Sequence, residues 1–156
     1  MPPEQLPAIG GVCAAFNARK ASRTITRLYA AAFEPVGLEP TQFALLAACN
    51  RQRTVTIGEL AVRHSMDPSA LARNIAVLQR RKLLSVRQGD DRRVRNVSIT
   101  AQGRRLLIRA LPHWQAVQEK LVGQLGEDQF LAAVEAMKAI TRAGEALLDQ
   151  PELAGR

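Results

Sequence analysis

Apolar and polar residues alternate along this chain with a helical period over most of its length. Apolar side chains recur every three or four positions in four stretches, which cover about residues 11–34, 41–50, 101–123 and 127–148. This spacing is typical of amphipathic helices that bury one face. The pattern therefore predicts a mainly α-helical protein.

Two of these helices carry specific expectations about caps and burial. The second helix is expected to begin with Thr41 as N-cap, after Pro40, and to bury Phe43, Leu46 and Ala47. The 101–123 helix follows a capping Thr100. Its expected buried residues are Leu107, Leu111, Trp114, Val117 and Leu121.

Between these stretches the sequence predicts two shorter helices joined by a turn. Thr56 and Glu59 form the pattern of a capping box, in which each side chain satisfies a backbone N–H of the other residue. This predicts a helix over about 57–64. Asp67 followed by Pro68 then predicts the start of a second short helix. Two such helices with a turn of about three residues indicate a helix-turn-helix.

The second short helix has a distinct buried stripe, formed by Leu71, Ile75 and Leu78. Burial of this stripe places another set of residues on the opposite, N-terminal face, namely Ser69, Ala70, Arg73 and Asn74. A recognition helix presents this face to the major groove of DNA. Arg can pair with guanine there, and Asn can pair with adenine.

Residues 84–88 and 95–99 each alternate apolar and polar side chains, as half-buried strands do. The charged segment 89–94 joins them, which predicts a β-hairpin, or wing, directly after the helix-turn-helix. The fold class is thus a mainly α, winged helix-turn-helix protein. Residues 37–100 are expected to form its DNA-binding region.

The outer helices, in residues 1–36 and 101–150, are long and amphipathic and lie at opposite ends of the chain. Packing against each other and against a second subunit is the simplest way to bury their apolar faces. We therefore expect a homodimer with a helical dimerisation region. A twofold axis would place two recognition helices about 34–36 Å apart, which suits a palindromic operator in double-stranded DNA.

The charge distribution supports nucleic acid as a partner. The whole chain has 22 Lys/Arg and 14 Asp/Glu, but residues 80–109 alone hold ten of the basic residues and two of the acidic ones. The remaining 12 basic and 12 acidic side chains balance. A basic block this confined is the electrostatic footprint of a protein that binds a polyanion.

Other classes of protein are disfavoured. The chain has no run of about 18 apolar residues, and its first residues lack a signal-peptide pattern, so we expect a cytoplasmic protein without a membrane span. Cys13 and Cys49 are then expected to be reduced thiols. Two His, two Cys and scattered acids form no metal cluster, catalytic triad or phosphate loop, so no enzyme, metal or cofactor is predicted.

The order of these elements and several stretches resemble the MarR family of bacterial transcription regulators. The similar stretches are Gly37-Leu38-Glu39-Pro40-Thr41-Gln42-Phe43-Ala44-Leu45-Leu46, Thr56-Ile57-Gly58-Glu59-Leu60-Ala61, Asp67-Pro68-Ser69-Ala70-Leu71-Ala72-Arg73-Asn74, and Asp91-Arg92-Arg93 with Val97-Ser98-Ile99-Thr100. The resemblance covers about residues 10–148. It implies a dimeric regulator, usually a repressor.

The resemblance also implies roles in the wing. Arg93 would enter a narrow minor groove, and Asp91 would hold the wing or orient Arg93. Lys82 stands where the family usually has Gly, at a cost of about 1 kcal/mol if the backbone is left-handed there. The full set of expected DNA contacts is Thr56, Ser65, Pro68, Ser69, Ala70, Arg73, Asn74, Arg80, Asp91, Arg92, Arg93 and Arg95.

How the regulator is controlled stays open at this point. The resemblance implies a small aromatic or anionic effector, bound between the dimer helices and the winged region, with candidate contacts Phe16, Arg23, Phe43, Leu46 and His113. An alternative is a redox-sensing repressor that uses Cys13, although the family's sensor cysteine aligns with Ala15. A third reading is an architectural protein that binds DNA without sequence preference.

Overall fold

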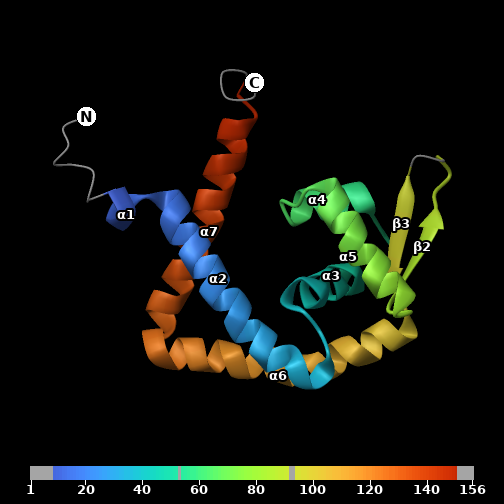
Figure 1. The fold of residues 1–156 in the computed structure, drawn as a ribbon, viewed down its shortest axis with the longest axis horizontal. Helices are drawn as coiled ribbons and strands as arrows, with labels where there is room; N and C mark the ends of the chain where they lie inside the picture. Colours follow the sequence, from blue (N-terminus) through green and yellow to red (C-terminus); the bar gives the residue numbers. More distant parts are fainter. Residues whose placement is uncertain (1–8, 53, 92–93, 151–156) are drawn as a thin grey trace. The chain divides into compact units, whose positions relative to one another are not determined.

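The computed structural model describes residues 9–52, 54–91 and 94–150 (Figure 1). Its contacts divide the chain into two compact units, Met1–Trp114 and Gln115–Arg156. The elements in chain order are α1 (Ile9–Val12), α2 (Ala14–Phe33), the 3-10 helix η2 (Glu34–Val36), α3 (Pro40–Arg51), β1 (Val55–Thr56), α4 (Ile57–Arg63), α5 (Pro68–Arg80), β2 (Leu84–Gln88), β3 (Arg95–Ile99), α6 (Ala101–Leu125) and α7 (Glu127–Leu148). No helix among the described residues is both long and apolar enough to cross a membrane.

The first helix is interrupted near its start, where the sequence predicted one continuous helix from about residue 11. Cys13 has an extended backbone and separates α1 from α2. The side-chain amide of Asn17 donates to the carbonyls of Gly11 and Cys13, at 3.2 and 3.0 Å. Adjacent glycines at positions 10 and 11 weaken a helix there, since Gly loses the most backbone freedom on folding.

The start of α3 also differs from the prediction. Thr41 is not the N-cap; Glu39 is, and Pro40 occupies the first helical position, where its missing N–H costs nothing. Gln42 completes a capping box by accepting from the backbone N–H of Glu39 at 3.4 Å. Leu46 is fully buried as expected, but Phe43 is only half-buried, as is Ala47.

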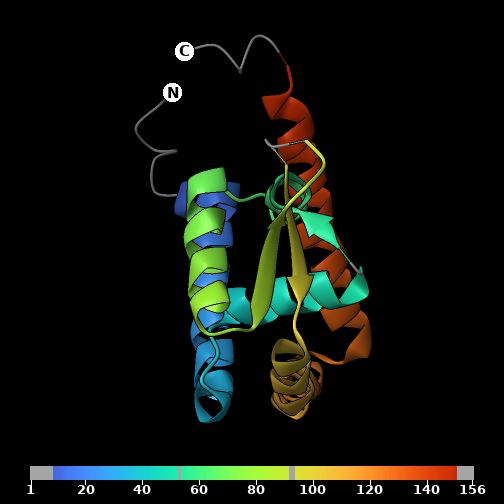
Figure 2. The same ribbon diagram turned by 90° about the vertical axis from the view of Figure 1, so that its right-hand side faces the viewer.

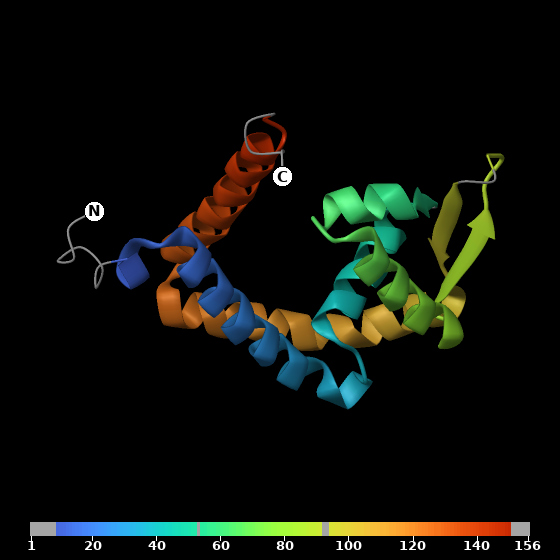
Figure 3. The ribbon, with the colours of Figure 1, turned by 45° about the horizontal axis from the view of Figure 1, so that its top comes forward.

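The helix-turn-helix is confirmed in its details (Figure 3). Thr56 accepts from the backbone N–H of Glu59 at 3.1 Å, and Glu59 accepts from that of Thr56 at 2.7 Å. Asp67 caps α5 by accepting from the N–H groups of Ser69 and Ala70 at 2.9 and 3.0 Å. The predicted stripe of α5 is buried, with Leu71, Ile75 and Leu78 at 0–3% exposure.

Both helices of the helix-turn-helix end in a Schellman motif with a residue other than Gly in the left-handed position. At the end of α4 this residue is Ser65, with φ 45°. At the end of α5 it is Lys82, with φ 58°. The N–H of Lys82 bonds to Gln79 and that of Leu83 to Leu78, both at 2.9 Å, which is the double bond pattern of the motif. Lys82 therefore has the left-handed backbone conformation that favours Gly.

The wing occupies the two predicted segments without any shift (Figure 2). β2 and β3 pair antiparallel, and β1 joins the other edge of β3, so the sheet order is β1-β3-β2. Val97 in the central strand is fully buried and lies opposite both Val55 and Val86. The sheet therefore closes one side of the core beneath α3 and α5.

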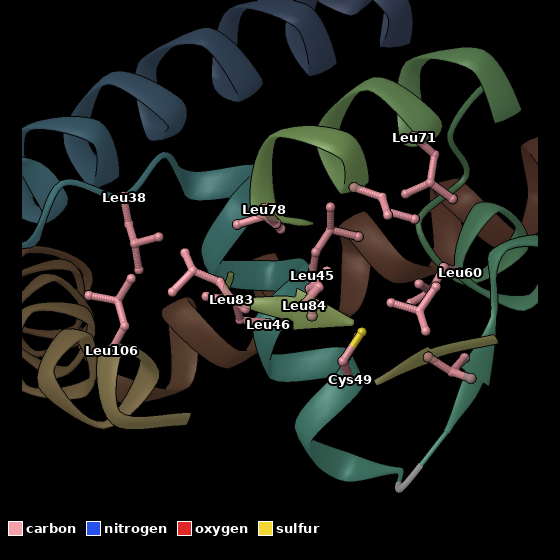
Figure 4. Packing of buried hydrophobic residues seen from close by; sticks show 14 of the residues in the cluster. Leu38, Leu45, Leu46, Cys49, Leu60, Leu71, Leu78, Leu83, Leu84 and Leu106 are labelled. Carbon is pink, nitrogen blue, oxygen red and sulfur yellow. The ribbon is translucent and has the colours of Figure 1, made fainter. Parts of the chain in front are cut away.

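The core is built from leucines, because the chain has few aromatic residues (Figure 4). Leu45 and Leu46 from α3, Leu60 from α4, and Leu71 and Leu78 from α5 are all fully buried. Burying one Leu side chain stabilises a fold by about 1.5–3 kcal/mol. These contacts fix α5 on α3 and α4, and so set which face of α5 meets solvent.

The start of α6 is tied to the turn that follows α5. Thr100 caps α6 by accepting from the N–H of Gly103 at 3.0 Å, and its hydroxyl donates to the carbonyl of Lys82 at 2.7 Å. A β-carbon at Gly103 would lie 2.2 Å from the carbonyl oxygen of Leu83. This close approach turns Gly103, Leu106 and Ala110 toward the core.

The buried face in the first half of α6 is therefore shifted by one residue from the predicted face. Leu111 is 44% exposed and Leu107 is only half-buried, whereas Leu106 and Ala110 are buried. Val117 is buried as predicted. Trp114 and Leu121 are half-buried.

The helix α7 belongs to the C-terminal unit and spans the segment that the apolar pattern predicted. Gly126, with φ 80°, separates it from α6. Several of its large apolar side chains are about half exposed in the single chain, namely Leu131, Met137, Ile140 and Leu147. Met137, Ile140 and Leu147 lie on one side of α7, whereas Leu131 lies on the other side. The homodimer was predicted from the amphipathic pattern of the outer helices. The expected dimerisation region, residues 1–36 with 101–150, stays a prediction.

Candidate nucleic-acid interface

The N-terminal half of α5 presents the predicted recognition face to solvent. Ser69 and Arg73 are exposed, while Ala70 and Asn74 are half-buried. Pro68 and the capping Asp67 begin the helix beside them and are also exposed. The face is therefore available to DNA, but its four residues are not equally free.

Hydrogen bonds inside the helix engage two of the four predicted contact residues. The hydroxyl of Ser69 donates to the Asp67 carboxylate, and the amide nitrogen of Asn74 donates to the carbonyl of Ala70 at 3.0 Å. Arg73 makes no hydrogen bond to any described residue. Its guanidinium is the group on this face best able to pair bidentately with a guanine.

Asp67 stabilises this arrangement electrostatically. The hydroxyl of Ser69, together with the backbone N–H groups of Ala70 and Ser69 and the charge of Arg73, holds the pKa of the Asp67 carboxyl below its usual range. The carboxylate is thus ionised at neutral pH, where it stabilises the positive end of the α5 dipole.

The turn before α5 contains a half-buried histidine, His64. His64 is the C-cap of α4, and its backbone N–H donates to the carbonyl of Leu60 at 3.0 Å. Its Nε2 is buried without a partner among the described residues. Burial, followed by the nearby charge of Arg63, lowers the pKa of His64. The neutral imidazole is therefore the form that this turn accommodates.

Thr56 and Ser65, both predicted DNA contacts, have structural tasks in the same region. The hydroxyl of Thr56 belongs to the α4 capping box, where it donates to Glu59 Oε2 at 2.9 Å. Ser65 provides the left-handed residue of the turn and is exposed. Their contact with DNA stays a prediction.

The wing places arginines on both of its faces. Gln88 lies opposite Arg95, and Arg87 lies opposite Asn96, so Arg87 and Arg95 point to opposite faces of the hairpin. Both arginines are exposed. Arg87 belongs to the basic block but was not among the predicted contacts, and the pairing register places it on the face opposite to Arg95.

The tip of the wing is closed by backbone hydrogen bonds. The N–H of Gly89 bonds to Val94, and the N–H of Val94 bonds to Asp91, both at 2.9 Å. Asp91 thus helps to shape the tip through its main chain. Arg92 and Arg93, the expected phosphate and minor-groove contacts, lie outside the described residues.

The tertiary structure divides the basic block between two places. Arg87 and Arg95 lie on the wing, while Arg81, Arg105 and Arg109 line a hollow at the base of the wing. Arg80, a predicted DNA contact, is the last residue of α5 and lies about 18 Å along the helix axis from Pro68. Only part of the block therefore lies beside the recognition face.

The candidate effector residues are distributed over α2, α3 and α6. Phe43 stacks on Phe33 with a ring-centroid distance of 4.7 Å. Phe16 lies about 25 Å along α2 from Phe33 and is 50% exposed, and Leu46 is fully buried. Arg23 is exposed and His113 is half-buried.

The two cysteines have different environments. Cys49 is fully buried, and this burial raises the pKa of its thiol to about 11, which leaves it unreactive. Cys13 is partly exposed at the start of α2. Cys13 is therefore the more accessible of the two thiols.

Comparison with known proteins identifies the family of this chain. A sequence model described as MarR family matches residues 36–94. The structure of the M. tuberculosis transcriptional regulator MosR in complex with DNA is similar at a TM-score of 0.80 and 32% identity, over 86% of this chain and 98% of that one. The chain belongs to the MarR family.

Two further relatives of this MarR-family chain are informative. The HTH-type transcriptional repressor MdtR of Bacillus subtilis is 26% identical over 113 residues, which is 72% of this chain and 73% of MdtR. Bordetella bronchiseptica BpsR, solved in a study of how 6-hydroxynicotinic acid regulates its DNA binding, has a TM-score of 0.75 at 22% identity, over 83% of this chain and 94% of that one.

Family membership confirms the main conclusions from the sequence. The protein is a DNA-binding transcriptional regulator with a winged helix-turn-helix, and it is not an enzyme. The individual DNA contacts stay predictions.

Proposed function

We propose that this MarR-family regulator is a homodimeric repressor that binds a palindromic operator in double-stranded DNA. The observation that carries the proposal is the exposed Arg73 on the rigidly capped N-terminal half of α5, beside a hairpin that presents Arg87 and Arg95 on its two faces. Such a unit places α5 in the major groove and the wing along the adjacent backbone or minor groove.

The exposed apolar face of α7 supports the homodimer. Met137, Ile140 and Leu147 share one side of this helix at about half exposure, and an apolar face of this kind suits an interface between copies. Two recognition helices, related by a twofold axis, double the few base contacts that one chain can make.

A selection of the purified protein against random double-stranded DNA tests the proposal. We expect an enriched palindrome of about 16–20 bp whose half-sites lie one helical turn apart. A reporter with this operator overlapping its promoter should be silenced when the protein is expressed. Activation of the reporter would contradict repression, and the absence of any enriched sequence would favour an architectural protein, with salt-sensitive and sequence-indifferent binding.

We propose that a small effector relieves the repression. BpsR, whose DNA binding is described as regulated by 6-hydroxynicotinic acid, supports effector control on this fold. A ligand has this effect only if it binds the DNA-incompetent state more tightly than the competent one. Phe16, Arg23, Phe43, Leu46 and His113 stay candidate contacts, and replacing Phe43 or His113 should weaken the response to an effector without changing operator affinity.

Thiol sensing through Cys13 is the second candidate for control. Cys13 is partly exposed at the start of a 20-residue helix, where an oxidant can reach it, whereas Cys49 is buried. Peroxide treatment of wild type and Cys13→Ser, followed by operator binding, tests this alternative. An identical response of both proteins would remove it.

A further inference from the structure

Basic and acidic side chains outside residues 80–109 are equal in number, but they are not evenly distributed along the chain. The helix α2 holds four of the basic ones, Arg19, Lys20, Arg23 and Arg27, and has no Asp or Glu between Ala14 and Phe33. All four are exposed, and within the described part of the chain none of them forms an ion pair. This helix therefore carries four uncompensated positive charges.

Three of these residues form a row along α2. Arg19, Arg23 and Arg27 lie four positions apart, so their side chains project from the same face of the helix. The arginine row spans about 12 Å along the helix axis. A hollow of about 620 Å³ follows this part of α2, and it places hydroxyl groups beside the cations. Its lining residues are Lys20, Ser22, Arg23, Thr24, Thr26 and Arg27.

The arginine row lies away from the surface that reads the operator. Phe33, at the C-terminal end of α2, is buried in the core that α2 shares with α3 and α5. Arg27 lies about 9 Å along α2 from Phe33, and Arg19 lies about 21 Å from it. Within the N-terminal unit, this part of α2 leads away from the helix-turn-helix (Figure 3). The row is thus a second basic surface, separate from the recognition face of α5 and from the wing.

A phosphate backbone has the chemistry that fits this row. Guanidinium groups donate two parallel hydrogen bonds to a phosphate, and the hydroxyls of Ser22 and Thr26 can donate to further phosphate oxygens. Asn17 is the one amide side chain of α2, and its nitrogen donates to the carbonyls of Gly11 and Cys13, so it cannot also donate to a base edge. The row therefore favours contacts that do not depend on base sequence.

We propose that the arginine row of α2 binds the phosphates of a second DNA duplex, so that a regulator bound at its operator connects two DNA segments. The protein is a DNA-binding regulator, so this polyanion is already within its reach. Each phosphate that the row neutralises releases condensed counterions, which drives the association. The connection of two segments rests on the proposed operator binding, whereas phosphate binding by the row does not.

Fluorescence anisotropy tests the second site on the full chain, saturated beforehand with unlabelled operator. A labelled duplex of scrambled sequence is then titrated at several salt concentrations between about 50 and 200 mM. We expect the wild type to bind this duplex with a Kd of about 10⁻⁶–10⁻⁴ M at physiological salt, as sequence-independent contacts do.

The double variant Arg19→Gln/Arg27→Gln should bind the scrambled duplex about tenfold or more weakly. Its plot of log K against log salt concentration should be shallower by about 2, because two phosphate contacts are lost. Both residues are exposed and Gln is a good helix former, so the variant should keep the fold and the operator affinity of the wild type. Arg23 is left in place because it is also an effector candidate.

The charge-matched control is Lys120→Gln/Arg142→Gln, which removes two exposed cations from the C-terminal unit. It should bind the scrambled duplex with the affinity and the salt dependence of the wild type. An equal loss in this control would make net charge the cause and would overturn the inference.

Other results would also overturn it. They are no binding of the scrambled duplex to the operator complex up to about 1 mM, or an unchanged affinity and salt dependence in the Arg19→Gln/Arg27→Gln variant. A variant that changes only the oligomeric state would show that the row contacts another copy of the chain. If no operator is found, the proposed repressor function fails, and the salt dependence of the free protein on the scrambled duplex still decides whether the row binds phosphates.

Discussion

Gly103 on α6 approaches the backbone of Leu83 so closely that a β-carbon there would lie 2.2 Å from the Leu83 carbonyl oxygen. Because backbone atoms cannot move as a flexible side chain does, the contact admits only Gly. It fixes the first turn of α6 on the turn that follows the recognition helix. The root of the wing, the C-terminus of α5 and the hollow with its three arginines all depend on this contact.

Replacing Gly103 by Ala should therefore destabilise the protein, although Ala is the better helix former. We expect the free energy of unfolding to fall by about 1–3 kcal/mol, because the overpacked turn must shift. Gly123→Ala is the matched control in the same helix, since a β-carbon there meets nothing within 4 Å. That variant should gain about 0.5–1 kcal/mol. Urea denaturation of both variants measures the difference, and equal stabilities would contradict the contact.

Lys82 provides the opposite case, a position that should improve with Gly. With φ 58° in the Schellman motif that ends α5, its side chain opposes the left-handed backbone. Lys82→Gly should raise the free energy of unfolding by about 1 kcal/mol. Lys82→Ala removes the same charge but keeps the β-carbon, so it should give no such gain in the same denaturation experiment. If Ala stabilised as much as Gly, charge and not backbone strain would be the cause.

His64 should make the stability depend on pH. Its folded-state pKa is lowered from about 6.5 by burial, so the folded protein favours the neutral imidazole. The unfolded chain then binds the proton more readily than the folded protein does. The contribution of His64 to the free energy of unfolding is therefore intact above pH 6.5 and declines as the pH falls below that value.

Chemical denaturation of wild type and His64→Gln between pH 8 and pH 5 measures this effect. The variant does not titrate in that range, so the stability of wild type relative to the variant should decrease toward acid. A pH-independent difference between the two proteins would show that His64 does not carry the effect.

The arginines of the recognition helix and the wing should affect DNA binding differently. Arg73→Ala should cost about 1–3 kcal/mol at the selected operator and relax the preference at one base pair, because Arg73 carries the exposed guanidinium on the N-terminal half of α5. Arg93→Ala should weaken binding by about tenfold or more without loss of fold, as the resemblance to the family's wing implies.

Fluorescence anisotropy with the selected operator and a scrambled duplex measures both effects. Lys138→Ala, in an exposed ion pair of α7, is the control variant and should bind as the wild type does. An unchanged affinity of Arg93→Ala would remove the wing tip from the mechanism. An unchanged base preference of Arg73→Ala would leave the assignment of α5 to base recognition without support.

Elements whose ends are marked by characteristic residues close in the sequence could be predicted before the structure was known. The Thr56–Glu59 capping box, the Asp67 cap and the limits of β2, β3 and α7 follow from residues within a few positions of each end. The left-handed position at Lys82 followed from the resemblance, which expects Gly there. Such signals are local, so they can be recognised in the sequence without knowledge of the tertiary structure.

The buried faces of the helices and the positions of the charges depend on contacts that form when the chain folds. The contact between Gly103 and Leu83 turned Leu106 and Ala110 inward in place of Leu107 and Leu111, a rotation that the apolar periodicity of α6 alone leaves open. Charges that are continuous in sequence separated into a wing group and a basal group, because the hairpin and α5 each extend over more than about 15 Å. Contacts between residues far apart in sequence set these outcomes, and a pattern read along one segment does not contain them.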